Sequence, residues 1–201
     1  VQNLKSNLEQ NKKSAKTLRA KLENNIRIKL KLNNDLIEQI DEKKGIKTKI
    51  EKMENRLTAS NDLKKLLMEH NSLKKEVKYG KNSRIDIYAD NPNGNNSYIE
   101  IKSVTLSRSK QLSEFPDSVT SRGSKHLLEL SEMSKKGNDC YLIYLVQRSD
   151  VTKFSIAKDI DQEYYKNSLI AKKNGVKFFA YKCEVTKKGI NIVSKLEINE
   201  N

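Results

Sequence analysis

The sequence predicts an α/β (α+β) fold, in which a compact core of about 130 residues follows a long coiled-coil helix. Three observations support this prediction. Apolar residues recur with a heptad period in residues 1–57, short apolar runs separated by turn residues replace that period after about residue 60, and helical and strand-like runs then alternate. We therefore expect a coiled coil over residues 1–57 and a second domain over residues 58–201.

Residues 1–57 keep one heptad register throughout. With position a beginning at Val1 and position d at Leu4, 12 of the 17 a and d residues are apolar, which is typical of a coiled coil. A shorter second stripe consists of Ile26, Leu30, Ile37 and Ile40. An apolar stripe of this length needs a partner. That partner would be a second copy in a homo-oligomer, a hairpin turning at Gly45, or a partner helix of another protein.

The elements of the second domain follow from local signals. Ser60 or Asn61 can cap a short helix, and Asp161 can cap a helix that continues to Lys173. Residues 141–146 form a continuous apolar run, as expected for a central strand buried on both faces. The remaining expected elements are strands at 84–89, 97–106, 176–185 and 190–198, a turn at 90–96, a loop at 107–121, and a helix at 122–136 that ends at Gly137.

The chain is strongly basic, with 40 Lys and Arg against 26 Asp and Glu and a net charge of +14. The excess is +9 in residues 1–79 (20 against 11) and +5 in residues 80–201 (20 against 15). A basic surface favours nucleic acid or an anionic membrane, although it also serves general solubility. No apolar run reaches about 18 residues, so no membrane span is expected. We expect DNA as the partner.

The two cysteines, Cys140 and Cys183, lie in apolar strand-like runs. This setting is typical of buried thiols rather than of a metal pair or a disulfide framework. Free thiols favour a reducing, cytoplasmic compartment, in which a DNA-binding protein would be associated with the nucleoid.

The main candidate site combines Asp86 with Glu100 and Lys102. Side chains alternate along a strand, so Glu100 and Lys102 share a face, and a hairpin with the preceding strand would place Asp86 beside them. Two carboxylates and the Ile101 carbonyl suit Mg²⁺ or Mn²⁺. Lys102 can orient or deprotonate a water, which suits phosphodiester hydrolysis. Glu-x-Lys on a strand also occurs as a simple surface ion pair.

Further polar residues are expected around this centre. Glu76, before the first strand, could reach the metal through water or remain a solvated carboxylate. At the start of the 122–136 helix, backbone N–H groups favour phosphate. Gln147 and Arg148 end the central strand, where α/β sites tend to form, although Arg148 could be a surface ion pair. The candidates at the helix start are Arg122, Lys125 and His126, of which His126 could instead be structural.

Several of these segments resemble the sugar fermentation stimulation protein family, SfsA, over about residues 60–201. The resemblance lies in Glu76–Gly80, Ser83–Asp86, Tyr98–Leu106, Phe115–Leu127, Val146–Asp150 and Ile160–Tyr164. It implies a PD-(D/E)xK nuclease-like domain, a restriction-endonuclease-like mixed sheet flanked by helices, and DNA binding. It also implies metal and catalytic roles for Asp86, Glu100 and Lys102. Members of the family normally carry an OB-like barrel before this domain, where residues 1–57 show a heptad pattern.

The function expected from these observations is a divalent-metal-dependent DNA endonuclease that is oligomerised or tethered by its coiled coil. One alternative is a non-catalytic DNA-binding or regulatory protein that keeps the nuclease fold. Another is a scaffold whose coiled coil recruits a partner.

Overall fold

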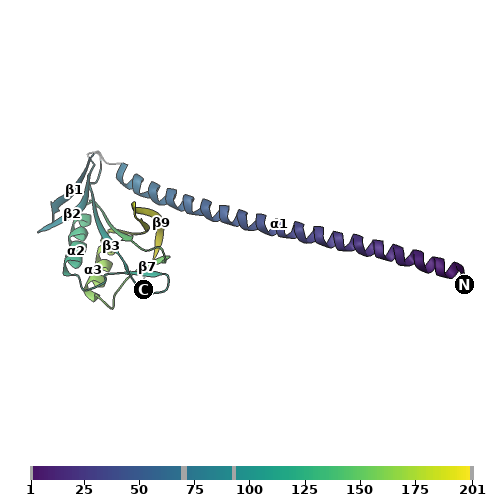
Figure 1. The fold of residues 1–201 in the computed structure, drawn as a ribbon. Coiled ribbons are helices and arrows are strands. Elements are labelled where there is room, and N and C mark those ends of the chain that lie inside the picture. Colours follow the sequence, from purple (N-terminus) through teal and green to yellow (C-terminus); the bar gives the residue numbers. More distant parts are fainter. Residues whose placement is uncertain (1, 69–71, 92–93, 200–201) are drawn as a thin grey trace. The chain divides into compact units, whose positions relative to one another are not determined.

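The computed structural model describes the backbone of residues 2–68, 72–91 and 94–199. Within the first helix it describes the side chains of residues 16, 18–19, 21–51, 53–56, 58–59 and 61. These residues form three helices and nine strands (Figure 1). In chain order they are α1 (Gln2–Met68), β1 (Ser72–Tyr79), β2 (Ser83–Asp90), β3 (Ser97–Val104), β4 (Leu106–Ser109), β5 (Leu112–Phe115), α2 (Ser121–Lys135), β6 (Asp139–Val146), β7 (Lys153–Ile156), α3 (Gln162–Lys173), β8 (Lys177–Thr186) and β9 (Gly189–Asn199).

Helix α1 is uninterrupted from Gln2 to Met68. It continues through Gly45, so a hairpin at this glycine is not formed, and the short helix expected after Ser60 is part of α1. Contacts divide the chain into two compact units, Val1–Glu51 and Lys52–Asn201. The boundary expected at residue 57 therefore falls within a continuous helix.

The nine strands form one mixed sheet in the order β1-β2-β3-β6-β8-β9-β7-β5-β4. Strands β1, β2 and β3 are antiparallel neighbours. Strand β6 lies between β3 and β8 and is parallel to both. Its residues Leu142, Tyr144 and Val146 are almost fully buried. The predicted mixed sheet with flanking helices is thus confirmed, and so is the central strand.

The two faces of the sheet are covered by different elements. Helices α2 and α3 pack on the face that carries Tyr144, where Leu127 and Tyr164 join the core, and the Tyr144 and Tyr164 hydroxyls lie 2.8 Å apart. On the opposite face, Ala59 of α1 is buried against a small cluster made by Ile99, Ile143 and Tyr181. The C-terminal turns of α1 therefore belong to the unit Lys52–Asn201.

Four strands depart from the sequence-based expectation. Residues 107–121, expected to form a loop, contain the end of β4 and all of β5, while β1 and β7 had no predicted counterpart. Glu76 accordingly lies within β1 rather than before the first strand. Strands β4, β5 and β7 have four residues each. Strand β5 pairs with β7, and β7 with β9, across long stretches of sequence, while β4 pairs with its neighbour β5, so sheet pairing rather than local pattern defines these strands.

Both cysteines are free and buried, as predicted. Burial raises the pKa of the Cys140 thiol to about 12, which makes its reactive thiolate scarce. Among the residues that the structure describes, no helix combines the length and the apolar character needed to cross a membrane.

Candidate active site

The β2–β3 hairpin brings Asp86 to the strand that carries Glu100 and Lys102. The register pairs Ile87 with Ile99, and just beyond that pair the backbone N–H of Ile101 donates to Asp86 Oδ2 at 2.6 Å. The predicted neighbourhood of the three residues is therefore present. The Asp86 carboxylate fixes this arrangement, because it accepts a hydrogen bond from the backbone of β3.

Glu100 lies at the centre of a polar cluster beneath α2. The residue is 2% exposed, and its Oε1 accepts a hydrogen bond of 2.8 Å from Lys102 Nζ. His126 Nδ1, from α2, is hydrogen-bonded to the same oxygen. The other oxygen, Oε2, is buried and has no hydrogen-bond partner among the described residues. The Oε1 of this carboxylate is thus held by two hydrogen bonds, and the Oε2 can still accept a further ligand.

The two carboxylates are shifted in opposite directions. Burial raises the pKa of Asp86, helped by the nearby Glu100 carboxylate, although the Ile101 hydrogen bond and Lys102 act against this shift. Burial alone would also raise the pKa of Glu100, but the His126 hydrogen bond and the Lys102 charge outweigh burial and lower it. Divergent pKa shifts in neighbouring carboxylates are common at functional sites.

These groups fit a hard divalent cation. A buried carboxylate oxygen without a partner is costly unless a ligand or water satisfies it, and Glu100 Oε2 is such an atom. The described residues hold no group of three or more His, Cys, Asp and Glu side chains placed to bind a metal. Mg²⁺ is commonly held by one or two carboxylates and several waters, a set that Asp86 and Glu100 can supply. The Ile101 carbonyl stays a predicted ligand.

A groove of about 590 Å³ lies between the β1–β2 turn and the start of α2. It brings together the predicted residues Glu76, Arg122, Lys125 and His126, and it adds Arg84 from β2. The β1–β2 register pairs Lys75 with Ile87 and Val77 with Ile85, so Glu76 lies opposite Asp86. Three cationic side chains thus border a groove that reaches the residues around Glu100.

The structure does not bring Gln147 and Arg148 into contact with this cluster. Gln147 Nε2 donates to Ser103 Oγ at 3.4 Å, and Ser103 alternates with Lys102 and so points to the opposite face of the sheet. Arg148 forms a two-pronged ion pair with Asp150, with contacts of 3.0 and 2.7 Å. For Arg148 this matches the surface ion pair considered as the alternative.

Sequence reasoning missed three residues near the site: Arg84, Tyr79 and Glu129. Arg84 and Asp86 are two positions apart on β2, so strand alternation could have identified Arg84. Glu129 is buried, and its Oε1 accepts from the backbone N–H of Lys81 at 3.0 Å. Burial, followed by the charges of Glu100 and Glu129, raises the pKa of Tyr79. No local signal links Tyr79 to Glu129, because only the fold places β1 against α2.

Comparison with known proteins shows the family and the fold of the chain. A family model described as the sugar fermentation stimulation protein RE domain matches residues 32–189. A sugar fermentation stimulation protein homolog of Pelagibacter ubique is 48% identical over 138 residues, which are 69% of this chain and 59% of that protein. Homologs from Rhodospirillum centenum and Aliivibrio fischeri are 44% and 47% identical and are covered over 55% and 57% of their lengths. The chain thus spans more than half, but less than two thirds, of these relatives.

A solved structure shows the same fold. It is described as that of Pyrococcus furiosus SfsA in complex with Ca²⁺, and it matches this chain with a TM-score of 0.60 and 26% sequence identity. The match covers 68% of this chain and 60% of the Pyrococcus chain.

Proposed function

Because the chain belongs to the sugar fermentation stimulation protein family, we propose that it hydrolyses phosphodiester bonds of DNA as an endonuclease dependent on Mg²⁺ or Mn²⁺. The observation that carries this proposal is the buried Oε2 of Glu100, which has no hydrogen-bond partner in the part of the chain that the structure describes. The Oε1 of the same carboxylate is fixed by Lys102 and His126. Asp86 supplies a second carboxylate beside it. The Ca²⁺ of the Pyrococcus relative supports a divalent cation, because Ca²⁺ and Mg²⁺ both prefer oxygen ligands.

Each side chain then has a role that follows from its contacts. Asp86 and Glu100 would hold the cation, and the cation, when bound, would polarise the phosphate and lower the pKa of an attacking water. Lys102 Nζ, already fixed by Glu100, would orient that water or balance the charge that develops on the phosphate. His126 would keep Glu100 in place. Arg84, Arg122 and Lys125 would bind phosphates along the groove.

Plasmid cleavage tests this function. The full chain should convert supercoiled plasmid to nicked or linear forms with Mg²⁺ or Mn²⁺ and should not do so in EDTA. Glu100→Gln and Lys102→Ala should each lower the rate by at least about a hundredfold, since removing one such group from a preorganised site commonly costs that much. Glu132→Gln and Lys135→Ala are matched controls, because this exposed ion pair lies at the far end of α2.

The outcome that rejects catalysis is equal cleavage by the wild type, Glu100→Gln and Lys102→Ala, which would indicate a contaminating nuclease. Absence of cleavage with any divalent ion would leave the second candidate, a non-catalytic DNA-binding protein. The basic groove favours this candidate, because its three cations need no metal to bind phosphate. Salt-sensitive DNA binding in EDTA without cleavage would establish it.

A further inference from the structure

The apolar stripe of α1 between Leu18 and Met53 is uncovered in the described chain. Leu22 is 60% exposed, Ile50 50% and Met53 69%. Large apolar side chains in a continuous stripe are stabilised when a partner surface removes them from water. The heptad repeat is long enough for a stable coiled coil, so we expect the partner surface to be another helix. The charges that flank the stripe can then indicate which helix this is.

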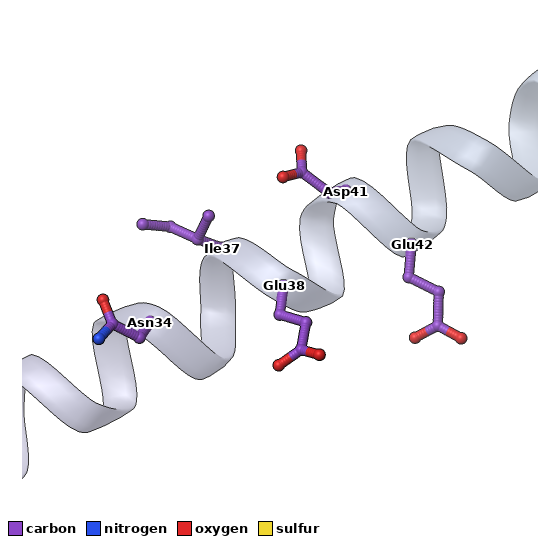
Figure 2. Close-up of a pocket in the computed structure, with 5 residues that line it drawn as sticks. All are labelled: Asn34, Ile37, Glu38, Asp41 and Glu42. Atoms are coloured by element: carbon purple, nitrogen blue, oxygen red, sulfur yellow. The ribbon is translucent and has the colours of Figure 1, made fainter.

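Two acidic and two basic side chains flank the stripe toward its C-terminal end. In the heptad register Glu42 and Lys49 occupy position g, and Lys47 and Glu54 occupy position e. All four are exposed, and the ion pairs described along α1 involve none of them. Figure 2 shows Glu42 projecting from the bare helix on the same side as Glu38. Charges at e and g set the choice and orientation of a partner helix.

A parallel, in-register pairing of two copies joins these charges with opposite sign. Position g of one helix then faces position e five residues further along the other helix. Glu42 therefore meets Lys47 of the second copy, Lys49 meets its Glu54, and symmetry doubles both contacts. From Lys21 to Glu54 this arrangement produces no like-charged g–e pair.

An antiparallel pairing of the same stripe would pack position a of one helix against position d of the other. Position e would then lie beside position e, and position g beside position g. Asp35 would then face Glu42, which is repulsive, and Arg19 would face Glu54, which is attractive. The attraction is offset by the repulsion. The flanking charges therefore favour the parallel orientation.

We propose that α1 pairs with α1 of a second copy of this chain in a parallel, in-register, two-stranded coiled coil. Lys29 and Lys43 at position a, and Asn25 and Gln39 at position d, agree with two strands, because long polar side chains at a narrow seam can still reach water. The proposal does not depend on catalysis, since none of these residues lies in the metal site.

Crosslinking tests the orientation in the full chain. In the parallel pair Leu22 faces Leu22, so Leu22→Cys should form a covalent dimer when oxidised with diamide. Asn24→Cys, at outward position c, is the matched control and should remain uncrosslinked. Cys140 and Cys183 are buried and should not react. Sedimentation should give twice the chain mass of 23.1 kDa.

Charge reversal tests the pairing itself. Glu42→Lys should weaken the dimer about tenfold, because two attractive contacts become repulsive, and adding Lys47→Glu should restore it. A chain that is monomeric at tens of micromolar, a larger assembly, or a dimer whose Leu22→Cys variant does not crosslink would overturn the proposal. So would a Glu42→Lys chain that dimerises like the wild type.

Discussion

At the scale of single residues, Asp86 illustrates how a carboxylate proposed to bind a metal can oppose stability. Its pKa is raised, mainly by burial. A folded-state pKa above the unfolded one contributes stability that is present at low pH and is lost as pH rises through the folded pKa. Without metal, ionised Asp86 therefore destabilises the protein at neutral pH, and a bound cation would reverse this effect.

Asp86→Asn should consequently raise the melting temperature in EDTA at pH 7 by roughly 2 °C. The amide oxygen can still accept from Ile101, while the buried charge is removed. The same substitution should abolish the rise in melting temperature that Mn²⁺ produces in the wild type. Thermal unfolding with and without Mn²⁺ measures both effects, and the gain in EDTA should disappear at acid pH.

The control substitution should change the melting temperature in the opposite direction. Asp159 forms a hydrogen-bonded ion pair with Arg108. The hydrogen bond from Arg108 lowers the pKa of Asp159 to about 2. Asp159→Asn should therefore lower the melting temperature at pH 7 and leave the Mn²⁺ effect intact. A destabilised Asp86→Asn protein, or one that Mn²⁺ still stabilises fully, would contradict the assignment of Asp86.

His126 should act as a positioning residue for Glu100. Its hydrogen bond is the largest influence that lowers the pKa of Glu100 against burial. His126→Ala should therefore shift the acid limit of Mn²⁺ binding to higher pH and weaken binding about tenfold at pH 7. Titrations of Mn²⁺ across pH measure both quantities. Leu128→Ala, an exposed change on the same helix, should alter neither, and an unmoved acid limit in His126→Ala would reject the role.

At the scale of elements, the groove between β2 and α2 should bind the phosphate backbone. Arg84→Ala and Arg122→Ala should each weaken DNA binding and reduce the slope of log K against log salt by about one, the expected loss for one phosphate contact. Fluorescence anisotropy in EDTA at several salt concentrations measures this without cleavage. Lys135→Ala, distant on α2, should leave the slope unchanged. A loss of affinity at constant slope would mean that the arginines do not contact phosphate.

The elements also show what local sequence could predict. The β2–β3 hairpin, the Asp161 cap, whose Oδ1 accepts from Tyr164 N at 2.8 Å, and the apolar run of β6 all carry short-range signals, and the structure has all three. Strand β1 was missed because it holds three lysines and one glutamate among eight residues and becomes a strand only by pairing with β2.

The site followed the same division. The proximity of Asp86, Glu100 and Lys102 could be predicted because strand alternation and the hairpin are local features. The contact of His126 with Glu100 depends on how α2 packs on the sheet, and the cluster that includes Tyr79 and Glu129 joins β1 to α2 across about fifty residues of sequence. Periodicity does not encode such packing, because it needs the register of three elements at once.

At the scale of the whole molecule, paired helices would place two phosphate-binding grooves on one particle. The unit Lys52–Asn201 begins beside Met53, the last residue of the paired stripe, so a parallel dimer would carry both copies of this unit at the same end of its coiled coil. Two tethered modules bind one DNA with a high effective concentration. The affinity of the dimer for DNA, and the salt dependence of that binding, should then reflect both copies of the groove.

A chain that cannot dimerise should therefore bind a long duplex with about half the wild-type salt slope, because half as many phosphates are contacted per particle. Leu36→Gln with Ile50→Gln removes two apolar a residues without changing net charge. Leu30→Gln with Ile37→Gln makes the same chemical change outside the a and d positions and should preserve both the dimer and the slope. Anisotropy in EDTA at several salt concentrations, with mass checked by sedimentation, measures the difference. If the monomeric variant keeps the wild-type slope, the two copies do not engage one DNA, and the paired helices serve assembly alone.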